Sequence, residues 1–399
     1  MLHSLIVRVK QPFLKLVPIA TPKCWVGEGK STQIDQFLQD EYCQNPLIIT
    51  DSVLLNLGLL KPMLASLDAA NINYQIFSEV TPDPDFEMVR LGTSKYTSGR
   101  HDSLIAFGGG SVIDCGKAII ASAGTKKDIS KLTGILKVHK RLPKMIAIPT
   151  TAGTGSEATI AAVVSDVNNK QKLAITDPSL VPDLAVLDAS LMLGLPAKIT
   201  AETGIDALTH AIESFVSLYA NSETKNLSID AIVKIFKHLP IAYADGSKKE
   251  SRQELAVASY QAGLAFTRTY IGYVHAIAHQ LGAFYHIPHG LANAMVLPKI
   301  LEFSFESCID SFATMARAIG CANKEHDNKS AAKLFLAAVN DLLSTVAIPS
   351  KIKQLQQNDI NELAKRAINE ALYEYPVPKV MSVAQCEKIL TSLLADKSL

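Results

Sequence analysis

The stretch SLIAFGGGSVIDCGKAII, residues 103–120, decides the fold of the first half of the chain. It opens with a short apolar run that is typical of a buried β-strand, and the residues after the glycines have the apolar spacing of a helix. Between the two, Gly108, Gly109 and Gly110 allow the backbone to turn sharply and to approach a ligand closely. The stretch therefore predicts a strand, a tight turn and a helix, in that order.

The same alternation extends through the first half of the chain. Residues 46–50 (PLIIT), 73–80 (NYQIFSEV) and 144–151 (KMIAIPTT) are typical of strands, whereas residues 34–42 and 85–96 have helical patterns. The strand runs show no polar alternation, which indicates burial on both faces. We expect a Rossmann-like α/β fold with a parallel sheet.

The pattern changes near residue 195, after which strand signals nearly vanish. TAETGIDALTHAIESFVSLYA, residues 200–220, is one of several long segments with apolar residues at helical spacing. We therefore predict two domains, an α/β domain over residues 1–192 and an all-helical domain over residues 193–399.

The glycine turn is a candidate phosphate site. The first N–H groups of the helix, together with Ser111, would bind a phosphate at the positive end of the helix dipole. The turn is not the usual GxGxxG fingerprint, because the third glycine would fall at Ile113. Taken alone, GGGS is also consistent with a tight turn that binds nothing.

A second loop, IPTTAGTGSEAT, also follows a strand and carries Thr150, Thr151 and Thr154. Two such loops at the carboxyl ends of strands occur where an open parallel sheet binds its ligand. Asp51 ends another strand, where a carboxylate accepts a hydrogen bond from a ribose 2′-hydroxyl and repels a 2′-phosphate. The sequence thus favours NAD over NADP, with a simple helix cap as the alternative role for Asp51.

Four of the ten histidines lie in the segment HAIAHQLGAFYHIPHG, which begins at His275. His275 and His279 share one face of a helix, as do Asp206 and His210 in GIDALTHAIES. His289, between a proline and a glycine, would bring a third imidazole to the same place. A carboxylate with two or three imidazoles suits Fe²⁺ or Zn²⁺ and suits Mg²⁺ or Ca²⁺ poorly. Spacing alone does not decide which histidines bind metal, and a single histidine in an apolar setting is usually a hydrogen-bonded core residue.

Composition argues against several other functions. The formal net charge is +1 and basic clusters are short, so no nucleic-acid partner is expected. The six cysteines are scattered without a CxxC pair, which is typical of a reducing compartment. The first residues lack the apolar core of a secretory signal, and no run approaches the ~18–20 apolar residues of a membrane span. We therefore expect a cytoplasmic protein without a membrane partner.

Five motifs occur in order along the chain: GGGSVIDCGKAI, IPTTAGTGSEAT, DPSLVPDLAVLD, TGIDALTHAIES and HAIAHQLGAFYHIPHGLANAMVLP. In this combination the chain resembles the iron-containing (group III) alcohol dehydrogenases over nearly its whole length. The segment GYVHAIAHQLGAFY is most similar to the lactaldehyde reductase, or 1,2-propanediol dehydrogenase, branch. The resemblance implies an N-terminal Rossmann-like NAD-binding domain, a helical metal- and substrate-binding domain of the dehydroquinate synthase-like type, and a homodimer.

The resemblance also assigns roles to residues. It implies the metal ligands Asp206, His210, His275 and His289. It also places His279 against cofactor and substrate as a catalytic residue that relays a proton, with a merely orienting role as the alternative. Together with the glycine turn, it implies the cofactor-binding residues Asp51, Asp83, Gly109, Gly110, Ser111, Asp114, Thr150, Thr151, Thr154, Lys172 and Leu191.

Three positions depart from the family pattern. Asp83 stands where the family's PNP loop has an asparagine, and Ala161 and Ala189 stand where relatives often have asparagine and proline. None of the three belongs to the implied metal ligands. The departures therefore concern cofactor affinity more than the type of reaction.

These features predict a metal-dependent oxidoreductase that transfers a hydride between NAD(H) and a small primary alcohol or aldehyde, such as a short diol or lactaldehyde. Fe²⁺ is the preferred metal and Zn²⁺ the alternative. A hydroxyacid–oxoacid transhydrogenase and a zinc polyol dehydrogenase of the glycerol dehydrogenase kind are alternatives within the same class. A lyase resembling dehydroquinate synthase would need a Lys and Arg cluster that the histidine segment lacks, and a metal-binding protein without activity is the remaining alternative.

Overall fold

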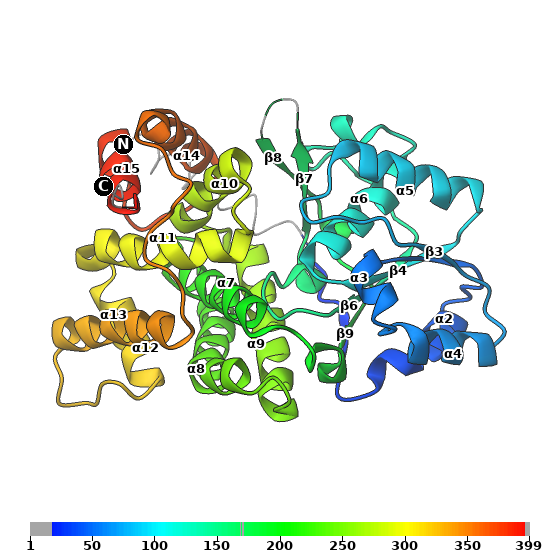
Figure 1. The fold of residues 1–399 in the computed structure, drawn as a ribbon, viewed down its shortest axis with the longest axis horizontal. Coiled ribbons are helices and arrows are strands. Elements are labelled where there is room, and N and C mark those ends of the chain that lie inside the picture. The colour runs from blue at the N-terminus through cyan, green and yellow to red at the C-terminus, as the bar shows by residue number, and fades with distance from the viewer. Residues whose placement is uncertain (1–17, 168, 170, 396–399) are drawn as a thin grey trace. The chain divides into compact units, whose positions relative to one another are not determined.

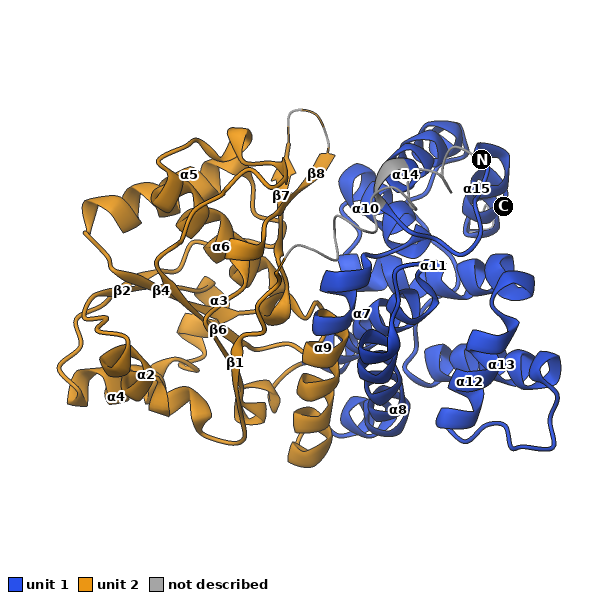
Figure 2. Cartoon of the chain, turned by 180° about the vertical axis from the view of Figure 1, so that it is seen from behind, with its two compact units in different colours: residues 1–17, 196–245, 264–399 blue, residues 18–195, 246–263 orange. Residues whose placement is uncertain are grey.

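The computed structural model describes residues 18–395 except 168 and 170. Residues 1–17 and 396–399 of the two predicted domains lie outside the described residues. The chain divides into two compact units, which Figure 2 shows in different colours. The α/β unit comprises Pro18–Leu195 and Gly246–Gly263, and the helical unit comprises Pro196–Asp245 and the described residues from Leu264 onward.

A six-stranded sheet in the order β1-β9-β6-β4-β2-β3 forms the centre of the α/β unit, and all of its strand pairs are parallel. Its strands are β1 (Lys23–Val26), β2 (Pro46–Ile49), β3 (Gln75–Phe77), β4 (Ser103–Gly108), β6 (Lys144–Pro149) and β9 (Leu184–Leu187). The helices between them are η1 (Lys30–Gln33), α2 (Ile34–Asp40), α3 (Ser52–Asn56), α4 (Lys61–Ala69), α5 (Phe86–Ser98), α6 (Gly110–Thr125), η2 (Ile129–Lys131), η3 (Ser156–Ala158) and η4 (Pro178–Leu180), and η5 (Ala189–Met192) follows β9.

Helices cover both faces of this sheet (Figure 1). Leu47 and Ile49 of β2 pack into the apolar cluster on the side of α5 and α6, whereas Ile48 packs into the cluster on the side of α2 and α4. Alternate residues of a strand point to opposite faces, so both sets must be apolar. This explains why β2 and β4 are continuous apolar runs and are buried along their whole length.

A second, smaller sheet in the α/β unit has the order β5-β8-β7. Its strands are β5 (Gly134–Ile135), β7 (Ala161–Asp166) and β8 (Gln171–Thr176), and β7 pairs with β8 in antiparallel register. The two longer strands are only partly buried. The parallel sheet that we predicted is therefore accompanied by a small mixed sheet that the sequence did not reveal.

The helical unit contains no strand element among its described residues. Its elements are α7 (Ala197–Val216), α8 (Ser222–Ala244), α10 (Tyr273–Tyr285), α11 (His289–Ser304), η6 (Phe305–Ser307), α12 (Ile309–Ala318), α13 (Asn328–Thr345), η7 (Gln357–Asp359), α14 (Ile360–Glu374) and α15 (Val383–Ser392). Helix α9 (Lys249–Thr269) belongs to the α/β unit up to Gly263 and to the helical unit from Leu264. Reciprocal side-chain caps start α8 at Asn221 and α15 at Ser382.

The predicted fold class is confirmed, because a parallel sheet covered by helices is followed along the chain by a helical part. The division into a cofactor-binding and a metal-binding domain stays a prediction. Within the described chain, no helix combines the length and the apolar character that a membrane crossing needs.

Candidate functional site

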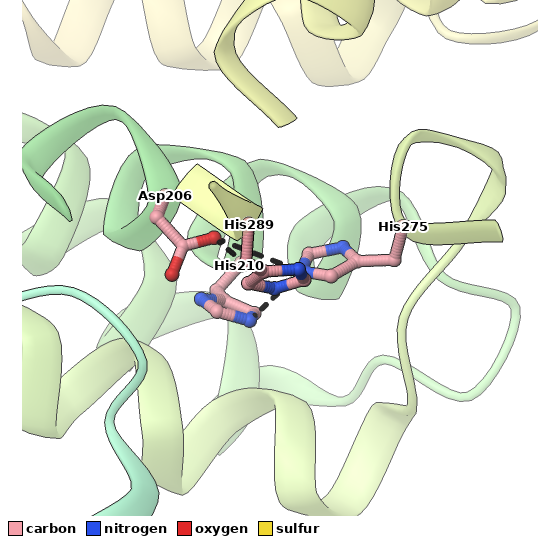
Figure 3. Close-up of side chains that lie close together, drawn as sticks. All are labelled: Asp206, His210, His275 and His289. Carbon is pink, nitrogen blue, oxygen red and sulfur yellow. Dashed lines mark hydrogen bonds and ion pairs between the residues drawn. The ribbon is translucent and has the colours of Figure 1, made fainter. Parts of the chain in front are cut away.

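Four side chains of metal-ligand type meet in the helical unit. Asp206 and His210 come from α7, His275 from α10 and His289 from the first residue of α11. One ligand atom from each lies within 4.8 Å of the others, and Figure 3 shows the four side chains pointing toward one another. Helix α7 and the consecutive helices α10 and α11, which follow much later in the sequence, thus supply one group of one carboxylate and three imidazoles.

Local structure explains how the segments reach this place. Asp206 and His210 are one turn apart on α7, so they share a face. Helix α10 ends at Tyr285 because His286 adopts the left-handed conformation, with φ of 55°. The chain then restarts as α11 at His289. A Cβ atom on Gly290 would lie 2.5 Å from the backbone oxygen of Glu202, so only glycine allows α11 to approach α7 this closely.

The distances within the group fit a single small cation. His275 Nε2 lies 2.9 Å from His210 Nε2 and 4.0 Å from Asp206 Oδ1, and His289 Nε2 lies 3.6 Å from the same Oδ1. Tetrahedral N and O ligands at about 2.1 Å from a metal are separated from one another by about 3.4 Å, within the range seen here. The mixed imidazole and carboxylate set suits Fe²⁺ or Zn²⁺. The residues therefore fit the metal that the resemblance implies.

Burial keeps His275 in the form that binds metal. The residue is 1% exposed, and burial and the neighbouring imidazoles of His210, His289 and His279 hold its pKa well below the usual range. An imidazole with a low pKa is neutral and keeps a lone pair for a cation.

Glu213 orients this imidazole. Its Oε2 lies 2.6 Å from His275 Nδ1, and its two oxygens accept the backbone N–H groups of Gly272 and Val274, each at 2.8 Å, at the start of α10. Burial raises the pKa of Glu213, and the two backbone donors act in the opposite direction. A carboxylate behind Nδ1 directs Nε2 toward the centre of the group, as carboxylates behind metal-bound histidines do.

Asn293 supports the opposite side of the group. It lies one turn after His289 on α11 and is fully buried. Its Nδ2 is 2.6 Å from Asp206 Oδ1 and 3.1 Å from His289 Nε2. Sequence reasoning missed both Asn293 and Glu213, because an asparagine or glutamate one turn from a ligand carries no signal until the tertiary contact is known.

His279 lies beside the group and does not belong to it. Its ring centroid is 5.5 Å from that of His289 and 6.0 Å from that of His275. Its Nδ1 is 2.7 Å from Glu370 Oε1, so its own carboxylate partner differs from that of His275. This arrangement matches the separation that the resemblance implies between a catalytic histidine and the ligands, although the catalytic role itself stays a prediction.

Several of the predicted cofactor residues lie where strands of the large sheet end, at the edge formed by the carboxyl ends of these strands. Asp51 follows β2, Gly109 follows β4, Thr150 follows β6, and Leu191 lies in η5 after β9. Because these strands are parallel, their carboxyl ends meet at the same edge. Asp83 also follows a strand, β3, and its Oδ1 binds Lys172 Nζ of β8 at 2.6 Å.

The glycine turn and the threonine loop touch each other at this edge. A Cβ atom on Gly110 would lie 2.5 Å from Thr154 Cγ2, and one on Gly109 would lie 3.3 Å from Thr151 Oγ1. Gly109 is the N-cap of α6 and provides no side-chain cap. The first N–H groups of α6, including that of Ser111, therefore open onto the edge as they do in anion sites.

Three predicted residues have structural partners within the α/β unit. Asp114 is partly buried, and its carboxylate accepts hydrogen bonds from Ser156 Oγ and Val163 N, so it connects α6 to the threonine loop and β7. Asp51 caps α3 by accepting the N–H of Leu54 at 2.9 Å, which was the alternative role. Leu191 is 9% exposed and packs in the cluster beside α2 and α4. Direct contact of these residues with a cofactor stays a prediction.

Comparison with known proteins identifies the family. Residues 21–189 match the iron-containing alcohol dehydrogenase family, and residues 200–394 match the C-terminal part of the same family. The chain belongs to the iron-containing alcohol dehydrogenase family. The predicted family and the predicted class of enzyme, an oxidoreductase of the alcohol dehydrogenase type, are thereby confirmed.

Named relatives of this iron-containing alcohol dehydrogenase cover most of its length. Lactaldehyde reductase of Escherichia coli (strain K12) is 34% identical over 88% of this chain and 93% of its own. The NAD-dependent methanol dehydrogenase of Bacillus methanolicus is 32% identical over 94% and 98%. A crystal structure of 1,3-propanediol oxidoreductase superposes with a TM-score of 0.91 at 32% identity, over 95% of this chain and all of that one.

Proposed function

We propose that this protein interconverts a short primary alcohol or diol and its aldehyde with NAD(H), using one divalent metal ion. The convergence of Asp206, His210, His275 and His289 within 4.8 Å carries the proposal. The relatives named above act on lactaldehyde, methanol and 1,3-propanediol by their names, which supports a small substrate.

The four converging side chains would hold the metal, with Fe²⁺ preferred over Zn²⁺. When bound, the cation would polarise the substrate oxygen as a Lewis acid and NAD would accept the hydride at nicotinamide C4. The chain itself would position the substrate and exclude water from the metal, because Asp206, His210 and His275 are almost fully buried. His279 would accept the alcohol proton at Nε2, since its Nδ1 faces Glu370.

At the sheet edge, the N–H groups of Gly110 and Ser111, with the hydroxyls of Thr150, Thr151 and Thr154, would bind the cofactor phosphates. Asp51 uses one oxygen to cap α3, and the other would accept from the ribose 2′-hydroxyl, which favours NAD over NADP. The remaining predicted cofactor contacts, Asp83, Gly109, Asp114, Lys172 and Leu191, are part of the same proposal.

We further propose a homodimer in the cytoplasm. The dimer follows from the family resemblance. The cytoplasmic location is supported by the six cysteines, all of which are free thiols. Size-exclusion chromatography with light scattering measures the oligomeric state, and fractionation of the native host measures the cellular location.

The metal requirement is the decisive test. The purified protein is analysed for bound metals and then assayed for NADH formation or consumption with a panel of short alcohols, diols and aldehydes. Exhaustive chelation should abolish turnover, and Fe²⁺ or Zn²⁺ should restore it. Turnover that survives complete metal removal, or no reaction with any member of the panel, would overturn the proposal.

A further inference from the structure

Glu370 on α14 forms a hydrogen-bonded cluster around His279. Its Oε1 lies 2.7 Å from His279 Nδ1 and accepts the hydroxyl of Tyr375 at 2.6 Å, while its Oε2 accepts Gln280 Nε2 at 2.8 Å. Helix α14 is remote in sequence from every metal-type residue of the site. Three side chains from two segments thus converge on one carboxylate that none of the sequence motifs includes.

The hydrogen bonds indicate which groups of the cluster donate and which accept. Gln280 Nε2 also lies 3.4 Å from the carbonyl oxygen of Ala276, so the amide nitrogen, with two acceptors in reach, faces Glu370. With Gln280 and Tyr375 both donating, Glu370 acts as an acceptor toward all of its partners. The remaining partner, His279 Nδ1, must then carry the proton, which leaves the Nε2 lone pair unprotonated in the neutral ring.

His279 and Glu370 differ from His275 and Glu213 in exposure. The side chains of His279 and Glu370 are 14% and 24% exposed, whereas those of His275 and Glu213 are 2% and 7% exposed. A ring that is partly open to solvent can exchange a proton with water, and a ring that is sealed cannot do so readily. Two histidines one turn apart are therefore each held by a separate carboxylate, in two different environments.

We propose that Glu370 is a positioning residue that fixes the orientation and the tautomer of His279, so that His279 Nε2 is presented to the substrate side of the site as an acceptor. This inference rests on the proposed role of His279 in moving the alcohol proton. Glu370 acts only through His279, and Tyr375 and Gln280 act only by holding Glu370. In this respect the pair resembles the carboxylate and histidine of hydrolase triads, where loss of the carboxylate leaves the wrong tautomer.

A double-mutant cycle tests the inference. Glu370→Gln, His279→Ala and the double variant are compared with the unmodified holoenzyme for kcat, for KM of the alcohol and for metal per chain. We expect Glu370→Gln to lower kcat about 10-fold with KM changed by less than about 3-fold, and to retain the metal. In the His279→Ala background the same substitution should change kcat by less than about 2-fold, because its effect is transmitted through the missing ring.

Matched variants separate this role from general support of α14. Glu362→Gln on the same helix removes an exposed carboxylate that pairs with Arg366, and it should leave kcat unchanged. Tyr375→Phe should lower kcat by a smaller factor than Glu370→Gln, and Glu370→Asp should recover part of the loss. If Glu370→Gln does not fold, Tyr375→Phe and Glu370→Asp take its place in the double-mutant cycle with His279→Ala.

The outcomes are distinguishable. If His279→Ala leaves kcat unchanged, the proposed proton role of His279 fails, and the inference about Glu370 fails with it. If His279→Ala slows turnover but Glu370→Gln does not, or if the two losses multiply in the double variant, only the inference is overturned. Loss of metal from Glu370→Gln would also overturn it, by showing that Glu370 supports the metal group instead.

Discussion

In the helical unit the candidate site consists of side chains, whereas at the edge of the α/β unit backbone N–H groups of the glycine turn take part beside the side chains. Asp206 and three imidazoles meet within 4.8 Å, and each offers a specific ligand atom. At the sheet edge, by contrast, the turn after β4 and the loop after β6 approach each other at Gly110 and Thr154, and a Cβ atom on Gly110 would clash with Thr154.

The difference teaches how each kind of site fails. We expect a metal group to lose its function when one ligand atom is removed, because such a site depends on each of its few ligands. The backbone N–H groups of the glycine turn cannot be removed by a side-chain substitution, so this part of the site is damaged instead by added volume. Substitutions that damage one region and spare the other therefore test this difference.

The largest effect is expected for His275→Ala. The substitution removes the most buried imidazole of the group, so bound metal should be lost and kcat/KM should fall at least about 10³-fold. His286→Asn is the matched control in the same segment, because His286 is exposed, lies outside the group and has the left-handed backbone that asparagine tolerates. Metal analysis and steady-state kinetics measure both variants, and equal effects from the two would contradict the ligand assignment.

Gly110→Ala should be the next most damaging. The new Cβ would lie 2.5 Å from Thr154 Cγ2, so the glycine turn and the threonine loop must separate. We expect KM for NAD to rise about 10-fold or more while the metal content is unchanged. Gly194→Ala in the same unit is the control, because a Cβ there has no atom within 4 Å. Normal NADH binding by the Gly110 variant, measured by fluorescence titration, would argue against a cofactor site at this turn.

The two regions also differ in how far the sequence predicts them. Buried parallel strands could be identified, because β2 and β4 need apolar residues on both faces. The pair β7 and β8 was missed, since both strands are only partly buried and AAVVSD shows no polar alternation. Helix α9 lies in the part of the chain that was predicted to be all-helical, but periodicity does not say to which unit each of its ends belongs.

For the candidate site, spacing indicated two helical pairs and no more. Asp206 with His210, and His275 with His279, followed from the helical repeat, whereas the choice among His279, His286 and His289 needed the family resemblance or the structure. The structure ends α10 before His286 and begins α11 at His289. Glu213, Asn293 and Glu370 were not predicted, because their importance depends on long-range contacts that leave no local pattern.

Asp51→Gly tests cofactor choice at a single side chain. Glycine is accepted at helix N-caps at a cost of only a few tenths of a kcal/mol, so α3 should persist without the bond to Leu54. Removing the carboxylate should raise kcat/KM for NADP relative to NAD about 10-fold, equivalent to about 1.4 kcal/mol. Asp327→Gly, which removes the equivalent cap from α13 in the helical unit, should leave that ratio unchanged. An unaltered ratio in the Asp51 variant would leave Asp51 with the capping role alone.

The smallest effect is expected for Asp83→Asn, which restores the amide that the family's PNP loop carries. Asp83 holds Lys172 Nζ at 2.6 Å; its own side chain is 44% exposed, whereas that of Lys172 is 8% exposed. We therefore expect the pair to contribute about 1 kcal/mol, the upper end of the range for exposed ion pairs. Releasing Lys172 for a cofactor phosphate should therefore lower KM for NAD by about 2–5-fold, with kcat and thermal stability nearly unchanged. Asparagine also tolerates the φ of 55° at this position, so no backbone strain confuses the comparison.

Glu41→Gln is the control, because it breaks a comparable pair with Lys144. Lys144 is the first residue of β6 and lies at the opposite end of that strand from the threonine loop. If both substitutions leave KM unchanged, Lys172 does not contact the cofactor, and the edge of the sheet binds NAD through its glycine and threonine loops without this lysine.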